Sequence, residues 1–191
     1  MLESASGFVN SFREYSENEF ESGKKFLSFS SEIKPREVSF LLCRNFSDDY
    51  VYWQIPQENF EVLAVNPIFT VSGEDENFNQ YLNSGLEQIK NEFVFNNPEA
   101  SFSLPLFFAA LKFAKDNRKV LWNDFPGFSF FLPEFIICRK EKKLMLIYNS
   151  RTDVPLEERC NSLRGFFESC RLSSERKKPL KIGYTDSSES D

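Results

Sequence analysis

Carboxylates and lysines are the residue types of this chain that could carry out acid–base or metal chemistry. Acidic side chains cluster at Asp48-Asp49 and at Glu74-Asp75-Glu76, while Lys112 and Lys115 lie at or just after the end of a long apolar run. Both acidic clusters fall in expected turns, where acids also solubilise the chain or begin a helix. A lysine at the end of a strand is ordinarily solvated. We therefore assign no catalytic residue, no metal ligand and no cofactor-binding residue to this chain.

The cysteine and histidine content excludes further classes of site. The four cysteines, Cys43, Cys138, Cys160 and Cys170, form no C-x-x-C pair, and the chain contains no histidine. Structural zinc sites draw on closely spaced cysteine and histidine ligands, so we do not expect one. A Ser-His or Cys-His nucleophile system is excluded because it needs a histidine.

The composition is that of a folded, acidic domain. Of 191 residues 41% are hydrophobic and 23 are phenylalanine, and the formal net charge is -6. This apolar content suffices for one core, and the acidic balance argues against nucleic-acid binding. No secretory signal and no apolar run of about 18 residues is recognised, so we expect no membrane segment and a cytoplasmic protein. The phenylalanines fit a well-filled core first, and a docking surface or apolar pocket second.

The first half of the chain predicts a helix followed by strands. Loosely spaced aromatic residues over Phe8–Leu27 fit an amphipathic helix. Runs of aromatic and β-branched residues then predict four strands, at Val38–Cys43, Tyr50–Ile55, Phe60–Val65 and Ile68–Val71. The first two are expected to form a hairpin, and Asn66-Pro67 is expected to end the third.

The second half predicts two helices and three strands. Helical spacing of apolar residues is found over Asn77–Phe93 and Pro155–Arg171. The expected strands are a central one at Leu104–Phe113, and Phe128–Arg139 (interrupted by Pro133) forming a hairpin with Lys143–Asn149. The fold class is therefore α+β, a largely antiparallel sheet with helices packed on one face. We expect an N-terminal helical or irregular segment over 1–37, an α+β domain over 38–172 and a polar linker or disordered tail over 173–191.

Three stretches of sequence, in the order and at the intervals of a known family, carry a resemblance to it. They are Tyr50–Pro56 with Glu61–Val65, then Leu106–Phe113, then Trp122–Phe128 with Phe131–Glu134. Together they resemble the N-terminal region of chorismate-utilising enzymes, isochorismate synthases most closely, over about 38–149. Asn66, Ala109 and Ala110 stand where that family has glycine. Glycine marks unusual dihedrals or a close backbone approach, a constraint that the alanines could show to be relaxed.

The resemblance implies a role in the Mg²⁺-dependent conversion of chorismate to isochorismate, for menaquinone or siderophore biosynthesis. In that family a C-terminal module supplies a lysine base, a glutamate acid and the carboxylates that hold Mg²⁺. None of that module's motifs is recognised here, and the polar end of the chain has the composition of a domain junction. We therefore expect a non-catalytic N-terminal part, inactive alone, with no cofactor in this chain.

The expected partner is the catalytic C-terminal module, in cis or in trans, or a second copy through an exposed apolar sheet face. The rings expected on that sheet are Phe107, Phe108, Phe130, Phe131 and Phe135, and the lone chain is expected to dimerise or aggregate. Two alternatives remain open at this point. One is a stand-alone binding, regulatory or dimerisation module that kept the fold without the activity, and the other is an unrelated α+β domain.

Overall fold

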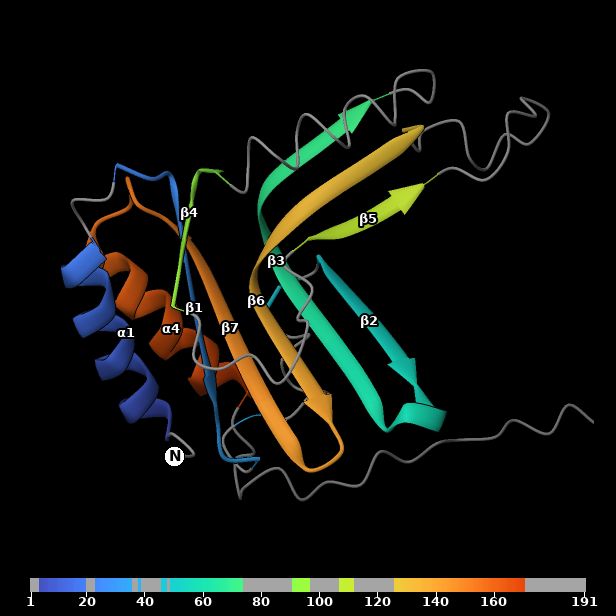
Figure 1. The fold of residues 1–191 in the computed structure, drawn as a ribbon, viewed down its shortest axis with the longest axis horizontal. Helices are drawn as coiled ribbons and strands as arrows, with labels where there is room; N and C mark the ends of the chain where they lie inside the picture. Colours follow the sequence, from blue (N-terminus) through green and yellow to red (C-terminus); the bar gives the residue numbers. More distant parts are fainter. Residues whose placement is uncertain are drawn as a thin grey trace, which may run out of the picture.

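A computed structural model describes residues 4–19, 23–35, 38, 46–47, 49–73, 91–96, 107–111 and 126–170. In this part of the chain, helices α1 (Ala5–Glu19) and α4 (Leu156–Cys170) pack side by side against one sheet. Figure 1 shows both helices on the same side of the strands. The predicted α+β class with helices on one face is confirmed.

The sheet is antiparallel except at one pairing. Its strands are β1 (Phe26–Glu32), β2 (Tyr50–Ile55), β3 (Phe60–Gly73), β4 (Phe93–Phe95), β5 (Phe108–Leu111), β6 (Phe128–Lys140) and β7 (Lys143–Arg151). They lie in the order β2-β3-β6-β7-β1-β4, with β5 paired to β6, and a short 3-10 helix (Pro56–Glu58) joins β2 to β3. Only the β1–β4 pairing is parallel among these strands.

Strand β6 organises the sheet because it is long enough to serve three neighbours. Along one edge it pairs with β3 over its whole length. Its other edge is shared, with β7 pairing from Phe135 to Lys140 and β5 from Phe128 to Phe131. The sheet therefore divides at the middle of β6 into a lower part under the helices and an upper part that flares away (Figure 1).

The main core lies between the helices and the sheet. Alternate residues of the strands point toward the helices, as the period of two requires, and the helices contribute one apolar stripe each. The largest contributors are aromatic, among them Phe8 and Phe12 of α1, Phe135 of β6 and Phe166 of α4, each fully buried. A smaller cluster of Val62, Ala64, Ile136 and Ile147 is buried on the opposite face.

The N-terminal segment differs from its prediction. The helix ends at Glu19 rather than near Leu27, and Phe26–Glu32 forms a strand between β7 and β4. Gly23 lies in the left-handed region (φ 68°) and allows the chain to turn between the two elements. The buried Phe26, Leu27 and Phe29 gain more from the sheet than from extending a helix that already has its apolar stripe.

Strand β3 is continuous where the sequence predicted a break. Asn66 adopts a left-handed conformation (φ 59°), and the register with β6 shifts between Pro67 and Phe69. Pro67 lies opposite Pro133, so two residues without an N–H face each other at this irregularity. Because ladder hydrogen bonds are interrupted at a β-bulge, neither proline removes a bond that the sheet needs there. This also explains why Pro133 does not interrupt β6.

The remaining predictions have mixed outcomes. The hairpin of β6 and β7 and the helix α4 are confirmed. Within the described residues, β2 pairs with β3, and β5 is a short strand on β6 rather than a central one. Most of Val38–Cys43, the helix expected over Asn77–Phe93 up to residue 90, and the tail at 173–191 lie outside the described residues. The domain boundaries stay predictions.

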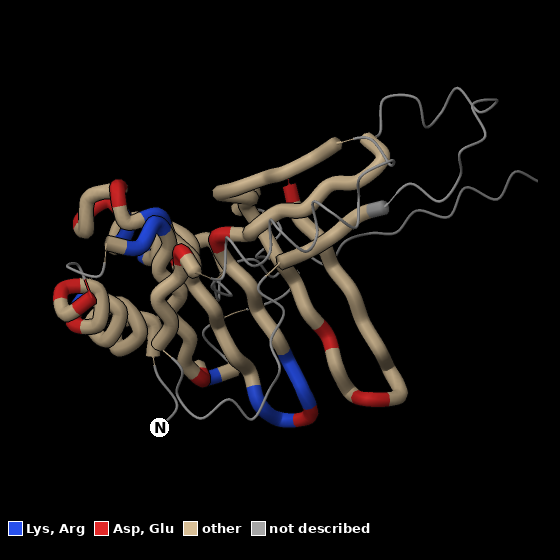
Figure 2. The backbone as a smooth tube through the Cα atoms, turned by 45° about the horizontal axis from the view of Figure 1, so that its top comes forward, with Lys and Arg blue, Asp and Glu red and all other residues tan. Residues whose placement is uncertain are grey.

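Charged residues gather at two neighbouring turns at the lower end of the sheet. Lys140, Lys142 and Lys143 surround the β6–β7 turn, and Glu58 and Glu61 flank the β2–β3 turn (Figure 2). Glu141 N–H donates to Asn59 O (2.9 Å), which ties the turns together. None of the helices in the described ranges has the length and apolar character needed to cross a membrane.

Candidate functional site

A row of polar residues crosses the middle of the otherwise apolar sheet. Ser28 of β1 lies opposite Asn149 of β7. Asn149 bonds the carbonyl of Pro133 in β6, and the next residue of β6, Glu134, bonds Asn66 of β3. Asn149 is 0% and Glu134 8% exposed. Polar side chains buried this deeply need hydrogen-bond partners, which makes the row the candidate site of this chain.

Glu134 is the centre of the row and joins three elements. Asn66 Nδ2 donates to Glu134 Oε2, and Ser162 Oγ donates to Oε1 at 2.5 Å. Both carboxyl oxygens are therefore engaged, one by β3 and one by α4. Burial raises the pKa of Glu134, and the hydrogen bonds from Ser162 and Asn66 oppose that rise.

Asn66 can reach Glu134 because of its backbone conformation. A left-handed residue at a β-bulge redirects its side chain relative to the strand. Asparagine tolerates this region better than most residues other than glycine. The position where the resemblance predicted glycine therefore keeps the glycine-like backbone and adds a side-chain amide.

Asn149 holds the row to the β-bulge from the other side. Its Nδ2 donates to Pro133 O (2.8 Å), while its Oδ1 is buried and has no hydrogen-bond partner in the described part of the chain. The neighbouring Tyr148 donates its hydroxyl hydrogen to Arg159 O (3.1 Å). Burial, and secondarily the nearby Glu134 carboxyl, raise the pKa of Tyr148 far above its ordinary value. The tyrosine therefore acts as a neutral hydrogen-bond donor.

A second polar ladder lies near the surface of the lower sheet. Tyr52 Oη donates to Glu61 Oε2 (2.9 Å), and Arg139 Nη1 lies 2.5 Å from Glu61 Oε1. Burial first, and the hydrogen bond to Glu61 second, raise the pKa of Tyr52. The ladder links β2, β3 and β6 beside the charged turns, where solvent weakens its electrostatic contribution.

The groups that the sequence singled out do not assemble into a site in the described residues. Cys138, Cys160 and Cys170 are buried free thiols, and burial raises the pKa of Cys138 to about 11. Within the described ranges, no group of three or more His, Cys, Asp and Glu side chains could hold a metal ion. Asp49 is exposed, and the other candidates (Asp48, Glu74–Glu76, Lys112, Lys115 and Cys43) lie outside the described residues.

The polar row was not anticipated as a site, although Glu134 was part of a recognised segment. The available signal was a carboxylate directly after a proline inside an apolar strand, flanked by Leu132 and Phe135. A charged residue in such a run is either exposed by alternation or buried with partners. The choice depends on strand register and on Ser162 of α4, neither of which is local in sequence.

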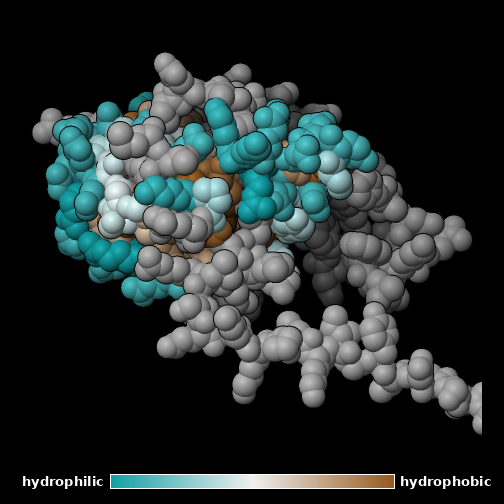
Figure 3. All heavy atoms as spheres, turned by 90° about the horizontal axis from the view of Figure 1, so that it is seen from below, coloured by the Kyte–Doolittle hydropathy of each residue, from teal (hydrophilic) through white to brown (hydrophobic). Residues whose placement is uncertain are grey.

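The surface away from the row is mixed. Seen from below, the described residues show mainly hydrophilic atoms, with apolar atoms visible between them (Figure 3). Strand β2 carries large exposed aromatic side chains, Trp53 (57%), Tyr52 (48%) and Tyr50 (46%). Of the rings expected on an exposed face, Phe135 instead lies in the core under α4, and Phe107, Phe108, Phe130 and Phe131 are half-buried.

Comparisons with known proteins identify a similar solved structure and a protein family. The structure of MenF, the menaquinone-specific isochorismate synthase from Escherichia coli, is similar with a TM-score of 0.46 and 13% sequence identity. The similarity covers 90% of this chain and 35% of that one, so the chain spans about a third of the solved protein. No curated protein matches by sequence. A model of the family described as chorismate binding enzyme matches residues 12–188, and since this is nearly the whole chain, the protein belongs to that family.

Proposed function

We propose that this chain forms the N-terminal, non-catalytic α+β part of an isochorismate-synthase-type enzyme. The observation that carries the proposal is the extent of the family match, which includes every strand of the described sheet and all of α4. The sheet is thus the family's own fold rather than an appended domain. The activity of such an enzyme is the conversion of chorismate to isochorismate for menaquinone or siderophore synthesis. In this proposal the activity belongs to the assembled enzyme and not to this chain alone.

The chemistry of the candidate site supports a scaffold role. Burial raises the pKa of Glu134, as expected for a general acid, yet both of its carboxyl oxygens already accept hydrogen bonds from Asn66 and Ser162. A general acid or base must reach the substrate proton directly or through one water. The polar row instead fixes the bend of β3 and β6 to α4, and so holds the shape of the sheet.

The Mg²⁺ of the family is assigned to the catalytic module. Bound Mg²⁺ supplies charge stabilisation for the substrate carboxylate and needs oxygen ligands in octahedral geometry. The described residues bring together no such carboxylate set. No step of the reaction is therefore derived through a metal held by this chain.

A chorismate turnover assay with Mg²⁺ tests the proposal. The three samples are the chain alone, a family catalytic module alone, and both together, with isochorismate separated chromatographically. We expect turnover only when the chain is combined with the module, and a reduced rate when Phe166→Ala disrupts the contact between α4 and the sheet. Turnover by the chain alone would contradict a non-catalytic role.

The second candidate function is a stand-alone binding or dimerisation module. The exposed Trp53 and Tyr50 favour it, because aromatic side chains are enriched at protein interfaces. This alternative predicts a cooperative thermal transition of the lone chain that a catalytic module does not change. A chain that becomes ordered only with the module favours the first candidate.

A further inference from the structure

Three buried polar side chains at one end of the α1–α4 pair have no hydrogen-bond partner for their polar atoms in the described part of the chain. They are Arg159 (Nε and Nη1), Ser16 (Oγ) and Ser150 (Oγ), which are 3%, 1% and 4% exposed. Buried donors are nearly always satisfied in folded proteins, and a buried guanidinium is especially costly to leave unpaired. Their occurrence together requires a physical explanation.

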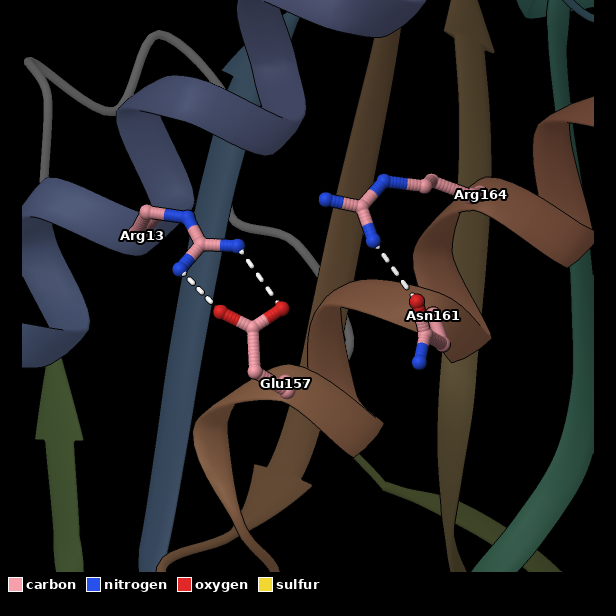
Figure 4. Close-up of polar contacts among 4 residues, drawn as sticks. All are labelled: Arg13, Glu157, Asn161 and Arg164. Atoms are coloured by element: carbon pink, nitrogen blue, oxygen red, sulfur yellow. Dashed lines mark hydrogen bonds and ion pairs between the residues drawn. The ribbon is translucent and has the colours of Figure 1, made fainter.

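The helix contacts place Arg159 and Ser16 near the same end of the helix pair. Arg13 bonds Glu157 in the first turn of α4 (Figure 4), whereas Phe8 meets Phe167 near the other end of that helix. The helices are therefore antiparallel. Ser16 lies on the buried stripe of α1, one turn beyond Phe12, whose ring centroid is 5.8 Å from the Arg159 guanidinium carbon. Helical side chains lean toward the helix N-terminus, which directs Arg159 toward the level of Ser16.

Strand β7 brings Ser150 to the same end. Tyr148 contacts the Phe12 ring (centroids 4.9 Å apart), and Ser150 follows two residues later on the same face of the strand. The chain then passes through residues 152–155 directly into α4. Ser150 thus lies on the helix-facing side of the sheet, beside the beginning of α4.

The three side chains offer hydrogen-bond donors and positive charge. Nε and Nη1 of the guanidinium together carry three N–H groups, and each serine hydroxyl can donate one hydrogen. The carboxyl of the nearby Glu157 is engaged by Arg13, and Glu158 is exposed. The Phe12 ring stabilises the cation through its π face but satisfies no N–H in the guanidinium plane. A buried cation with unpartnered N–H groups, and with unpartnered hydroxyls on the neighbouring elements, favours an anion over a cation or an apolar group.

We propose that Arg159, Ser16 and Ser150 bind a small monovalent anion, either chloride or the carboxylate of a small acid, between α1, α4 and β7. The anion would neutralise the buried guanidinium and complete its hydrogen bonds. Its site would lie between the two packed helices and the sheet, where a small ion is more easily accommodated than a large one. The bound anion would hold α1 against α4, so that folding and anion binding are linked. This inference does not depend on the proposed enzyme activity.

Thermal unfolding at constant ionic strength tests the proposal. Midpoints are measured for the wild type and for Arg159→Met while chloride or formate replaces a large organic sulfonate, which is too bulky to enter between the packed helices and the sheet. The matched control is Arg164→Met, because Arg164 is exposed on the same helix and its Nη1 bonds the neighbouring Asn161 (2.6 Å). We expect a saturable rise of several degrees in the midpoint for the wild type and Arg164→Met, and none for Arg159→Met.

The same titrations distinguish the two candidate anions, chloride and a small carboxylate. Saturation by chloride alone identifies a halide site, and saturation by formate as well identifies a site that also accepts carboxylates. Equal responses in all three proteins, or no response in the wild type, would overturn the proposal and leave ordered water as the partner of these groups.

A second measurement keeps the test decisive if Arg159→Met does not fold. Chloride NMR line broadening by the folded wild-type protein reports a bound, exchanging ion directly. The double variant Ser16→Ala/Ser150→Ala retains the charge, and we expect it to weaken anion affinity several-fold. Absence of excess broadening in the wild type, or unchanged affinity in the double variant, would contradict the proposed ligand set.

Discussion

The rings of Phe135 and Phe166 lie parallel, with centroids 4.0 Å apart and an angle of 4° between their planes. Both side chains are fully buried, and the Phe46 ring meets each of them edge-on. The pair joins the centre of β6 to the last turns of α4. It is therefore a direct apolar contact between that helix and the strand that pairs with three others.

Substitution of Phe166 tests the weight of this contact. Phe166→Ala leaves a large cavity beside Phe135, and we expect it to lower the free energy of unfolding by about 3–5 kcal/mol. Urea denaturation followed by circular dichroism measures the loss. Phe95→Ala, at a ring that is 41% exposed on β4, serves as the control and should cost much less. Equal losses would mean that α4 is not held by the stacked pair.

The pH dependence of stability tests the environment of Glu134. Because burial raises the pKa of Glu134, the folded state binds a proton that the unfolded state releases more readily. Its contribution is therefore fully present below the unfolded pKa and is lost as pH rises through the raised folded pKa. We expect wild-type stability to decrease over this window, and that of Glu134→Gln to remain flatter.

Chemical denaturation at a series of pH values provides the measurement for Glu134. Glutamine keeps the size of the side chain and cannot ionise, while Glu158→Gln at an exposed position controls for general charge effects. A wild type that gains relative stability over Glu134→Gln as pH rises would show that the two donors, rather than burial, dominate the carboxyl.

The roles of Asn66 in the backbone and in the polar row can be separated. Asn66→Gly and Asn66→Ala both lose the hydrogen bond to Glu134. Only alanine also has a Cβ atom that makes the left-handed backbone conformation at φ 59° unfavourable. We expect Asn66→Ala to be less stable than Asn66→Gly by about 1 kcal/mol. If the two variants have equal stability, the β-bulge does not require a left-handed residue.

Sequence patterns predicted the elements whose stability is local. Helix α4 has a complete apolar stripe, and the β6–β7 hairpin has two long runs around a short charged turn. Strand β1 was missed because Phe26–Glu32 has few β-branched residues, and its place depends on pairing with the distant β7. The continuity of β3 was missed because a proline was expected to end the strand, although the left-handed Asn66 compensates for it.

The candidate site could not be predicted for a related reason. The burial of Glu134 depends on the register of β6 with β3 and β7, and its second partner, Ser162, comes from a helix 28 residues later. Neither relation leaves a local periodic signal. The unusual position of Arg159 on the buried side of α4 was also hidden, since an arginine near a helix start is ordinarily solvated.

The exposed aromatic residues of β2 lead to a prediction about association. Trp53 lies opposite Val62, whose side chain belongs to the apolar cluster on the face away from the helices. Its ring also contacts Phe60, with centroids 6.4 Å apart, so the exposed indole extends a buried apolar surface. Such surfaces associate because burying them removes apolar area from water. We expect the lone chain to self-associate, and Trp53→Ser to reduce this.

Sedimentation velocity over a range of concentrations measures that association, and binding of an apolar dye reports the exposed surface. Gln57→Ser in the adjacent, exposed turn is the matched control and should behave as the wild type. Adding a family catalytic module distinguishes the two partners: a module that uses this surface suppresses both self-association and dye binding. A wild-type chain that stays monomeric at all concentrations and binds no dye would show that the aromatic residues of β2 drive no association.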